Sequence, residues 1–129
     1  DREAILKCIL EADQSKVIVT HGTDTLIETA RFVQKNLLSD SKNFGKIVMF
    51  VGAFLPERFK DSDADMNIGS ALGALDILHM KQVATNDVRR NDDTCVYIAL
   101  GGRVIPAIVA ARDSNTGLFC RSDELAGGN

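Results

Sequence analysis

Apolar residues along the chain gather in three short unbroken runs, and each run predicts a β-strand. The runs cover residues 16–20, 46–51 and 95–100 and are rich in Val and Ile. A strand with apolar side chains on both faces is typical of a parallel sheet that helices cover on both sides. After the turn signal Gly101-Gly102, residues 103–105 are expected to return as a further short strand.

A helix is predicted ahead of each of these runs, because apolar residues there recur every three or four positions. The predicted helices cover residues 2–13, 25–38 and 65–80. The polar, charge-rich segment 81–94 has no clear period and is expected to be a surface loop. The apolar face predicted for the third helix consists of Ile68, Ala71, Leu72, Leu75 and Leu78.

Strands that alternate with helices predict an α/β fold of three layers, α/β/α, with a mainly parallel sheet in the middle. We expect residues 1–120 to form one domain and residues 121–129 to be a loose tail. A parallel sheet ordinarily has a strand before its first helix, and that strand would lie upstream of Asp1. The chain is therefore expected to be a fragment of a longer protein or a processed product.

Composition and charge narrow the classes of function. The 129 residues are 45% apolar and carry a net charge of −3 without a basic stripe, which argues against nucleic-acid binding. No apolar run is long enough to span a membrane, and no signal peptide is visible. Neither G-x-G-x-x-G nor a P-loop lysine motif occurs, so a nucleotide-binding flavodoxin-like domain ranks last and no cofactor is expected.

The three cysteines indicate the redox state of the compartment in which the protein is found. Cys8, Cys95 and Cys120 are widely spaced, odd in number and free of any C-x-x-C pair. This pattern argues against a disulfide framework or a zinc site, so no metal is expected. We interpret them as free thiols in a reducing compartment, the cytoplasm, with Cys8 and Cys95 buried.

Candidate chemistry is concentrated where the first strand ends and the second helix begins. Thr23 and Asp24 lie there, in the polar turn 21–24. Open α/β sheets bind ligands at such positions, and the free N–H groups of a helix start favour anions. A small zwitterion would fit, with its carboxylate on the amides and its ammonium on Asp24. The same residue types also suit plain helix capping, and His21 is interpreted as a packed, hydrogen-bonded residue rather than a base.

The residues around this turn carry a resemblance to a known family. Residues 19–30, V-T-H-G-T-D-T-L-I-E-T-A, resemble a signature of the bacterial-type L-asparaginase/glutaminase family nearly residue for residue. Residues 51–56, V-G-A-F-L-P, resemble the family's strand end V-G-A-x-x-P. Residues 96–106 and 112–119 resemble the endings of the short, single-domain asparaginase-like proteins.

A further segment, residues 62–72, resembles the family's S-D-G-x-x-N-x-x-x-A pattern. Asp63 and Asn67 fit that pattern, whereas Ala64 stands where the family usually has Gly. Both matching residues fall near a predicted helix start, where carboxylates and capping amides are favourable. We interpret Asp63 as structural rather than catalytic.

The resemblance implies the three-layer fold of an asparaginase N-terminal domain. It also implies an amidohydrolase that converts the side-chain amide of L-asparagine, or a related amide, to aspartate and ammonia. The implied catalytic residues are Thr23, which polarises the amide or positions water, and Asp24, which holds the substrate ammonium. Gly22, Thr23, Asp24 and Ala53 are the implied substrate-binding residues, Ala53 through its backbone. By analogy with the larger relatives, the chain is expected to form a homo-oligomer.

One departure from the family bears directly on catalysis. The family's nucleophile is a Thr in an N-terminal T-G-G-T strand, and no such motif occurs in these residues. Threonine is a poor nucleophile until a base or a strong hydrogen bond activates it. We therefore expect no or trace amidase activity from this chain. Two readings stay open: a fragment of a working amidohydrolase that is inactive alone, or a non-catalytic amino-acid-binding module that has lost the nucleophile.

Overall fold

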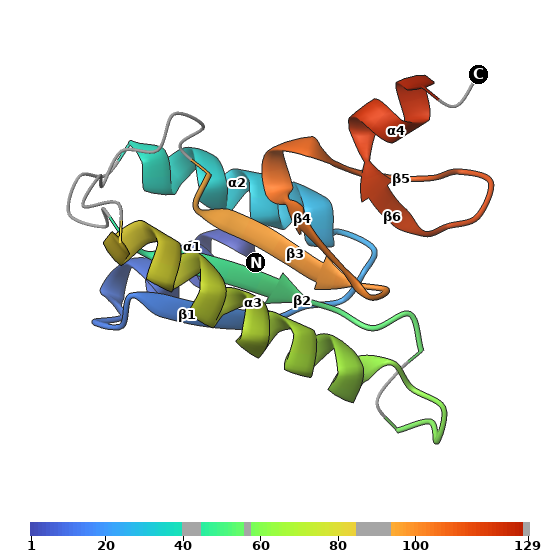
Figure 1. Ribbon diagram of the computed structural model, residues 1–129, viewed down its shortest axis with the longest axis horizontal. Helices are drawn as coiled ribbons and strands as arrows, with labels where there is room; N and C mark the ends of the chain where they lie inside the picture. The colour runs from blue at the N-terminus through green and yellow to red at the C-terminus, as the bar shows by residue number, and fades with distance from the viewer. Residues whose placement is uncertain (40–44, 56–57, 85–93, 128–129) are drawn as a thin grey trace.

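Four strands form the central sheet in the order β1-β2-β3-β4 (Figure 1). In the computed structural model, residues 1–39, 45–55, 58–84 and 94–127 are described. Strands β1, β2 and β3 are parallel, and β4 returns antiparallel to β3. The predicted mainly parallel sheet is confirmed, and each predicted strand begins within one residue of the observed one. The strands are β1 (Lys16–Thr20), β2 (Ile47–Val51), β3 (Val96–Leu100) and β4 (Arg103–Pro106).

Three helices cover the two faces of this sheet. They are α1 (Arg2–Glu11), α2 (Leu26–Leu38) and α3 (Ala64–Ala84). Buried residues of α1 and α2 pack on one face, whereas those of α3 pack on the other (Figure 1). The three-layer α/β/α prediction is thereby confirmed.

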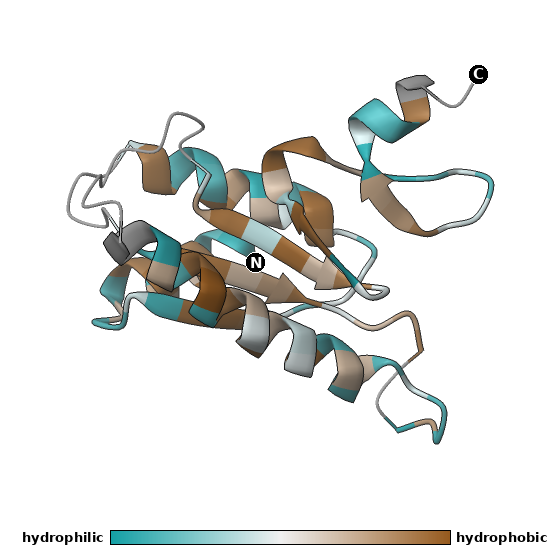
Figure 2. Ribbon diagram, viewed as in Figure 1, coloured by the Kyte–Doolittle hydropathy of each residue, from teal (hydrophilic) through white to brown (hydrophobic). Residues whose placement is uncertain are grey.

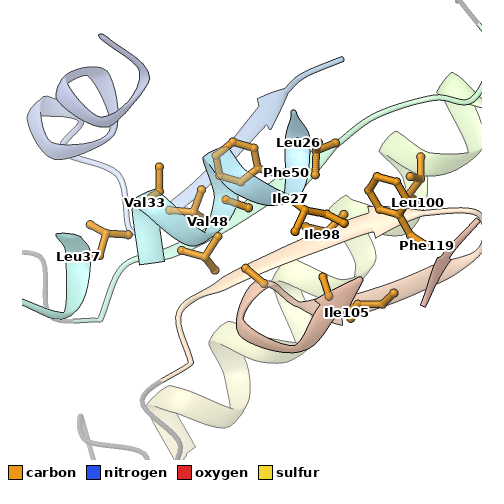
Figure 3. Packing of buried hydrophobic residues seen from close by; sticks show 14 of the residues in the cluster. Leu26, Ile27, Val33, Leu37, Val48, Phe50, Ile98, Leu100, Ile105 and Phe119 are labelled. Carbon is orange, nitrogen blue, oxygen red and sulfur yellow. The ribbon is translucent and has the colours of Figure 1, made fainter. Parts of the chain in front are cut away.

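The pleat of β2 explains how one strand serves both layers. Val48 and Phe50 face α2, whereas Met49 and Val51 face α3, and all four are buried. Successive side chains of a strand point to opposite faces, so an unbroken apolar run is what a strand between two helical layers requires. Figure 2 shows hydrophobic residues along β2 and β3, and Figure 3 shows the side chains of α2 against Val48 and Phe50.

Helix α3 differs from its prediction in two respects. It continues to Ala84, so the loop predicted from residue 81 starts too early; residues 85–93 of that segment lie outside the described residues. Its predicted apolar face is also partly wrong, because Ile68 and Leu72 are 37% and 55% exposed. Asn67 and Ala71 are instead fully buried against the sheet. The helix is apolar on most of its circumference, so spacing alone does not single out the face that the sheet covers.

The C-terminal part of the chain adds elements that the sequence pattern did not predict. They are the 3-10 helix η2 (Ala107–Val109), strands β5 (Ala110–Arg112) and β6 (Phe119–Arg121), and helix α4 (Ser122–Gly127). Strands β5 and β6 pair antiparallel as a separate two-stranded sheet, called here the β5–β6 hairpin.

The ends of the chain also refine two expectations. Helix α4 lies within the segment 121–129 that was expected to be loose, and Glu124 of this helix pairs with the Arg103 guanidinium of β4. The domain boundary at residue 120 stays a prediction. Cys8, Cys95 and Cys120 form no disulfide, but Cys8 is exposed, so its predicted burial is wrong, and Cys95 is half-buried.

Candidate functional site

The turn that carries Thr23 and Asp24 begins where β1 ends at the sheet edge. The register places Thr20 opposite Val51, and the His21 backbone N–H donates to the Val51 carbonyl at 2.9 Å. Both strands therefore end at the same level, which brings residues 21–25 beside the loop after β2. In an α/β sheet this carboxyl end of the strands is the usual place for a ligand.

Helix α2 starts at this turn without a side-chain cap. Thr25 is the N-cap residue, and no side-chain hydrogen bond closes that end of the helix. The capping alternative therefore gives neither Thr23 nor Asp24 its role. An uncapped helix start presents N–H groups that suit an anionic ligand group.

His21 has the packed role that the sequence suggested. Its Nδ1 donates to the Gly22 carbonyl at 2.7 Å, and its ring edge lies against Phe50, 6.1 Å between centroids. A carbonyl oxygen only accepts, so this contact places the ring proton on Nδ1. The side chain thus stabilises the turn.

The loop after β2 packs directly against the Thr23 turn through Gly52. A Cβ atom at Gly52 would lie 2.9 Å from Leu26 Cδ1 and 3.1 Å from both the His21 carbonyl oxygen and Thr23 Cγ2. Only a residue without a side chain permits this approach. Gly52 thus sets the distance between the turn and Ala53, which follows it in the chain.

Asp63 and Asn67 hold that same loop from the start of α3. The Asp63 carboxylate accepts from the backbone N–H groups of Phe54 and Leu55 at 3.2 and 3.1 Å, and from the Asn67 amide at 2.8 Å. The Asn67 amide also donates to the Gly52 carbonyl at 2.9 Å. Burial alone would raise the pKa of Asp63, but these donors outweigh it and hold that pKa below its ordinary value. The structural interpretation of Asp63 agrees with these contacts.

A cavity of about 430 Å³ opens beside Thr23 and Asp24. Groups of both charges line it. The two carboxylates belong to α2 and the turn before it, and the two cations are guanidinium groups. Gly22 and Ala53 are not among the residues that line it. The lining residues are Thr23, Asp24, Ile27, Glu28, Arg31, Ala110, Ala111 and Arg112.

Both arginines of this cavity join α2 and its turn to the segment after β4. The Arg31 guanidinium donates to the carbonyl of Ala107, at 3.1 Å, and to that of Ala110. Arg112 Nη2 donates to the Thr23 carbonyl at 2.6 Å. Sequence reasoning missed Glu28, Arg31 and Arg112 as site residues. Glu28 and Arg31 follow the turn at helical spacing and could have been noticed. Arg112 opens the segment 112–119 that resembles the family, but nothing in that segment assigns it to this turn.

Neither a metal-binding cluster nor a membrane-spanning helix occurs in the described parts of the chain. There, no group of three or more His, Cys, Asp or Glu side chains lies close enough to hold a metal ion. Among the same residues, no helix has the length and apolar character needed to cross a bilayer.

Comparisons with known proteins agree on one family. Residues 2–117 match the family model described as "Asparaginase, N-terminal". A curated protein of Schizosaccharomyces pombe, "Probable L-asparaginase 1", is 34% identical over 70 residues, which are 54% of this chain and 18% of that protein.

A solved structure matches over most of the chain. The "Probable Cytoplasmic L-asparaginase from Campylobacter jejuni" is 25% identical, with a TM-score of 0.63, and the match covers 95% of this chain and 33% of that one. The chain thus spans about a third of the solved relative and about a fifth of the curated one. Since the family model covers nearly all of its residues, this chain belongs to the asparaginase family.

Proposed function

We propose that this chain contributes to an asparaginase-type amidohydrolase and binds an amino-acid amide, L-asparagine or a related compound, at the Thr23–Asp24 turn. The observation that carries the proposal is the cavity beside this turn, where carboxylates and guanidinium groups face one ligand-sized space at an uncapped helix start. Such an arrangement matches a zwitterion, which carries both signs of charge. The product of the reaction would be L-aspartate, together with ammonia.

Each residue of the proposed site has a distinct task. Asp24 is exposed at the mouth of the turn and binds the substrate ammonium. The Thr23 hydroxyl polarises the side-chain amide or positions the attacking water. Gly22 and Ala53 contribute backbone groups, and Gly52 and Asp63 fix where Ala53 lies relative to the turn.

Binding of L-aspartate tests the site independently of turnover. Calorimetry with L-aspartate and L-asparagine is expected to give saturable binding that Asp24→Asn weakens by about tenfold, the value of one charged hydrogen bond. Asp13→Asn is the matched control, because Asp13 is also exposed but lies before β1, at the opposite end of the sheet. A well-folded chain that binds neither amino acid would contradict the proposal.

Ammonia release separates the two readings of the catalytic role. A fragment of a working enzyme and a binding module should both release no or only trace ammonia from this chain with Asn or Gln. The natural full-length protein should release it only under the first reading. Substantial turnover by the chain itself, abolished by Thr23→Ala, would instead make Thr23 the nucleophile.

We also propose that the protein is cytoplasmic and assembles with further copies of itself. Cys8, Cys95 and Cys120 form no disulfide, which supports a reducing compartment. Strand β1 lies at the edge of the sheet, and α3 leaves Leu72, Ile77 and Met80 more than half exposed. Apolar surface of this kind is typical of protein interfaces. Sedimentation velocity is expected to show a species heavier than the 14.0 kDa chain, and a monomer at all concentrations would contradict the assembly.

A further inference from the structure

The β5–β6 hairpin touches the proposed site through one arginine. Arg112, the last residue of β5, reaches 89 positions back along the chain and donates to the Thr23 carbonyl at 2.6 Å. The same guanidinium lies over the ring of Phe119, the first residue of β6, 4.9 Å from its centroid. The two residues also pair across the hairpin, so its ladder fixes the spacing between them. Stacking on the ring restricts the guanidinium and directs its donor at the turn.

Phe119 connects this arginine to the other segment of the proposed site. It is 4% exposed, and its ring packs edge-on against Phe54, 5.8 Å between centroids. Phe54 follows Ala53 in the loop after β2, and its backbone N–H is held by Asp63. Arg112, Phe119 and Phe54 therefore form a continuous path from the Thr23 turn to the Ala53 loop.

The base of the hairpin is fixed to α2 as well. Arg31 donates to the carbonyls of Ala107 and Ala110, at the two ends of the segment that leads into β5. Two arginines thus bind backbone carbonyls across the same cavity. Arg31 of α2 binds the segment that leads into β5, and Arg112 of the hairpin binds the Thr23 turn. A carbonyl fixed by a guanidinium loses freedom that a flexible turn would otherwise have to lose when a ligand binds.

We propose that Arg112 is a positioning residue, and that the hairpin aligns the Thr23–Asp24 turn with the Ala53 loop for amino-acid binding. The effect on amino-acid affinity rests on the proposed function, whereas the alignment of the turn with the loop is a property of the ligand-free protein. Arg112 acts on the Thr23 carbonyl, which belongs to the same peptide group as the Asp24 N–H. A change at Arg112 is therefore transmitted directly to Asp24.

The first test is the amide spectrum of the ligand-free chain. Arg112→Gln should shift the backbone signals of Asp24 and Ala53, and Arg112→Lys, which keeps the charge, should shift them less. Arg58→Ala is the matched control, since the Arg58 guanidinium lies over the Phe59 ring at the same 4.9 Å and Arg58 does not line the cavity beside Thr23. Signals that move only within the hairpin would overturn the proposal.

The second test is the affinity for L-aspartate. Arg112→Gln should raise the Kd by about tenfold, the loss of one charge-assisted hydrogen bond, with partial rescue in Arg112→Lys and no change in Arg58→Ala. Phe119→Leu should raise the Kd through the same path while Arg112 keeps its charge.

The outcomes separate the two proposals. Equal affinity of Arg112→Gln and the wild-type chain would overturn the positioning role and leave the proposed function standing. If the wild-type chain binds no amino acid, the proposed function fails, and the amide spectra of the ligand-free variants still decide whether Arg112 orders the turn. A drop in the thermal midpoint without any shift at Asp24 would assign Arg112 a stabilising role alone and overturn the proposal.

Discussion

Replacing Gly52 by Ala is the sharpest perturbation of the packing between the turn and the loop after β2. The added methyl group would meet Leu26 Cδ1 at 2.9 Å, and the His21 carbonyl oxygen and Thr23 Cγ2 at 3.1 Å. Leu26 is fully buried, so its side chain has little room to withdraw. The His21 carbonyl belongs to a peptide chain held by a strand-end hydrogen bond, so relief requires the turn to move.

The expected loss follows from this overpacking. Extra methyl groups in well-packed interiors cost about 1–3 kcal/mol of unfolding free energy. For a chain of this length, that corresponds to a fall in Tm of roughly 3–10 °C. Because the displaced atoms include Thr23, affinity for L-aspartate should fall with stability.

Urea unfolding with a paired calorimetric titration measures both effects. Gly73→Ala is the control, since a Cβ there meets nothing within 4 Å and the residue lies inside α3. That substitution should raise the unfolding free energy by about 0.5–1 kcal/mol, the difference in helix propensity. A Gly52→Ala chain as stable as the wild type, with unchanged affinity, would refute the packing argument.

Two further substitutions and one pH titration test contacts that hold the elements around the site. Asp63→Asn should lower the unfolding free energy by about 1 kcal/mol at pH 7. Because folding lowers the pKa of Asp63, this difference from wild type should be complete above about pH 4 and vanish as pH falls through the lowered pKa. Urea unfolding at several pH values measures it. Lys46 is 8% exposed, and its ammonium donates to two carbonyls at the end of α1. Lys46→Met should therefore lower the unfolding free energy by about 2 kcal/mol in the same assay. An unchanged urea midpoint would contradict the contact. The hydrogen bond from Arg103 lowers the pKa of Glu124 to about 2, so the bond should persist well below pH 4.5 and break as pH falls through about 2. An NMR titration of the Glu124 carboxyl checks this. A titration midpoint near the ordinary pKa of 4.5 would contradict it.

The strands of this fold were predictable because a strand that is buried on both faces requires an unbroken run of apolar residues. Residues 47–51, I-V-M-F-V, contain no polar residue, and few structures besides a covered parallel strand accommodate such a run. The start of α2 was predictable for a related reason, since the polar turn 21–24 separates two apolar segments of different period. Thr23 and Asp24 became candidates from that position together with the resemblance of residues 19–30 to the family.

The covered face of α3 was less predictable. Ile68 and Leu72 are as apolar as the buried Leu75, yet they are 37% and 55% exposed. The polar Asn67 is fully buried, and its amide donates to the Gly52 carbonyl and the Asp63 carboxylate. Spacing reports where apolar residues lie, but not which hydrogen bonds a buried amide finds. A helix that is apolar on most sides therefore leaves its orientation undecided in the sequence.

Arg112 was unpredictable for a different reason. It opens the segment 112–119, whose resemblance to the family assigns Arg112 no partner, and its acceptor is a backbone carbonyl. Carbonyls are present at every residue, so no residue type marks the one that a guanidinium selects. Only the packing of the hairpin across α2 places Arg112 next to Thr23.

A crystal structure of the chain with L-aspartate tests the central claim most directly. The account predicts the amino acid in the cavity beside α2, with its ammonium at hydrogen-bond distance from the Asp24 carboxylate and its side-chain carboxyl next to the Thr23 hydroxyl. L-Aspartate bound elsewhere, or bound in the cavity without contact to Thr23 and Asp24, would contradict it.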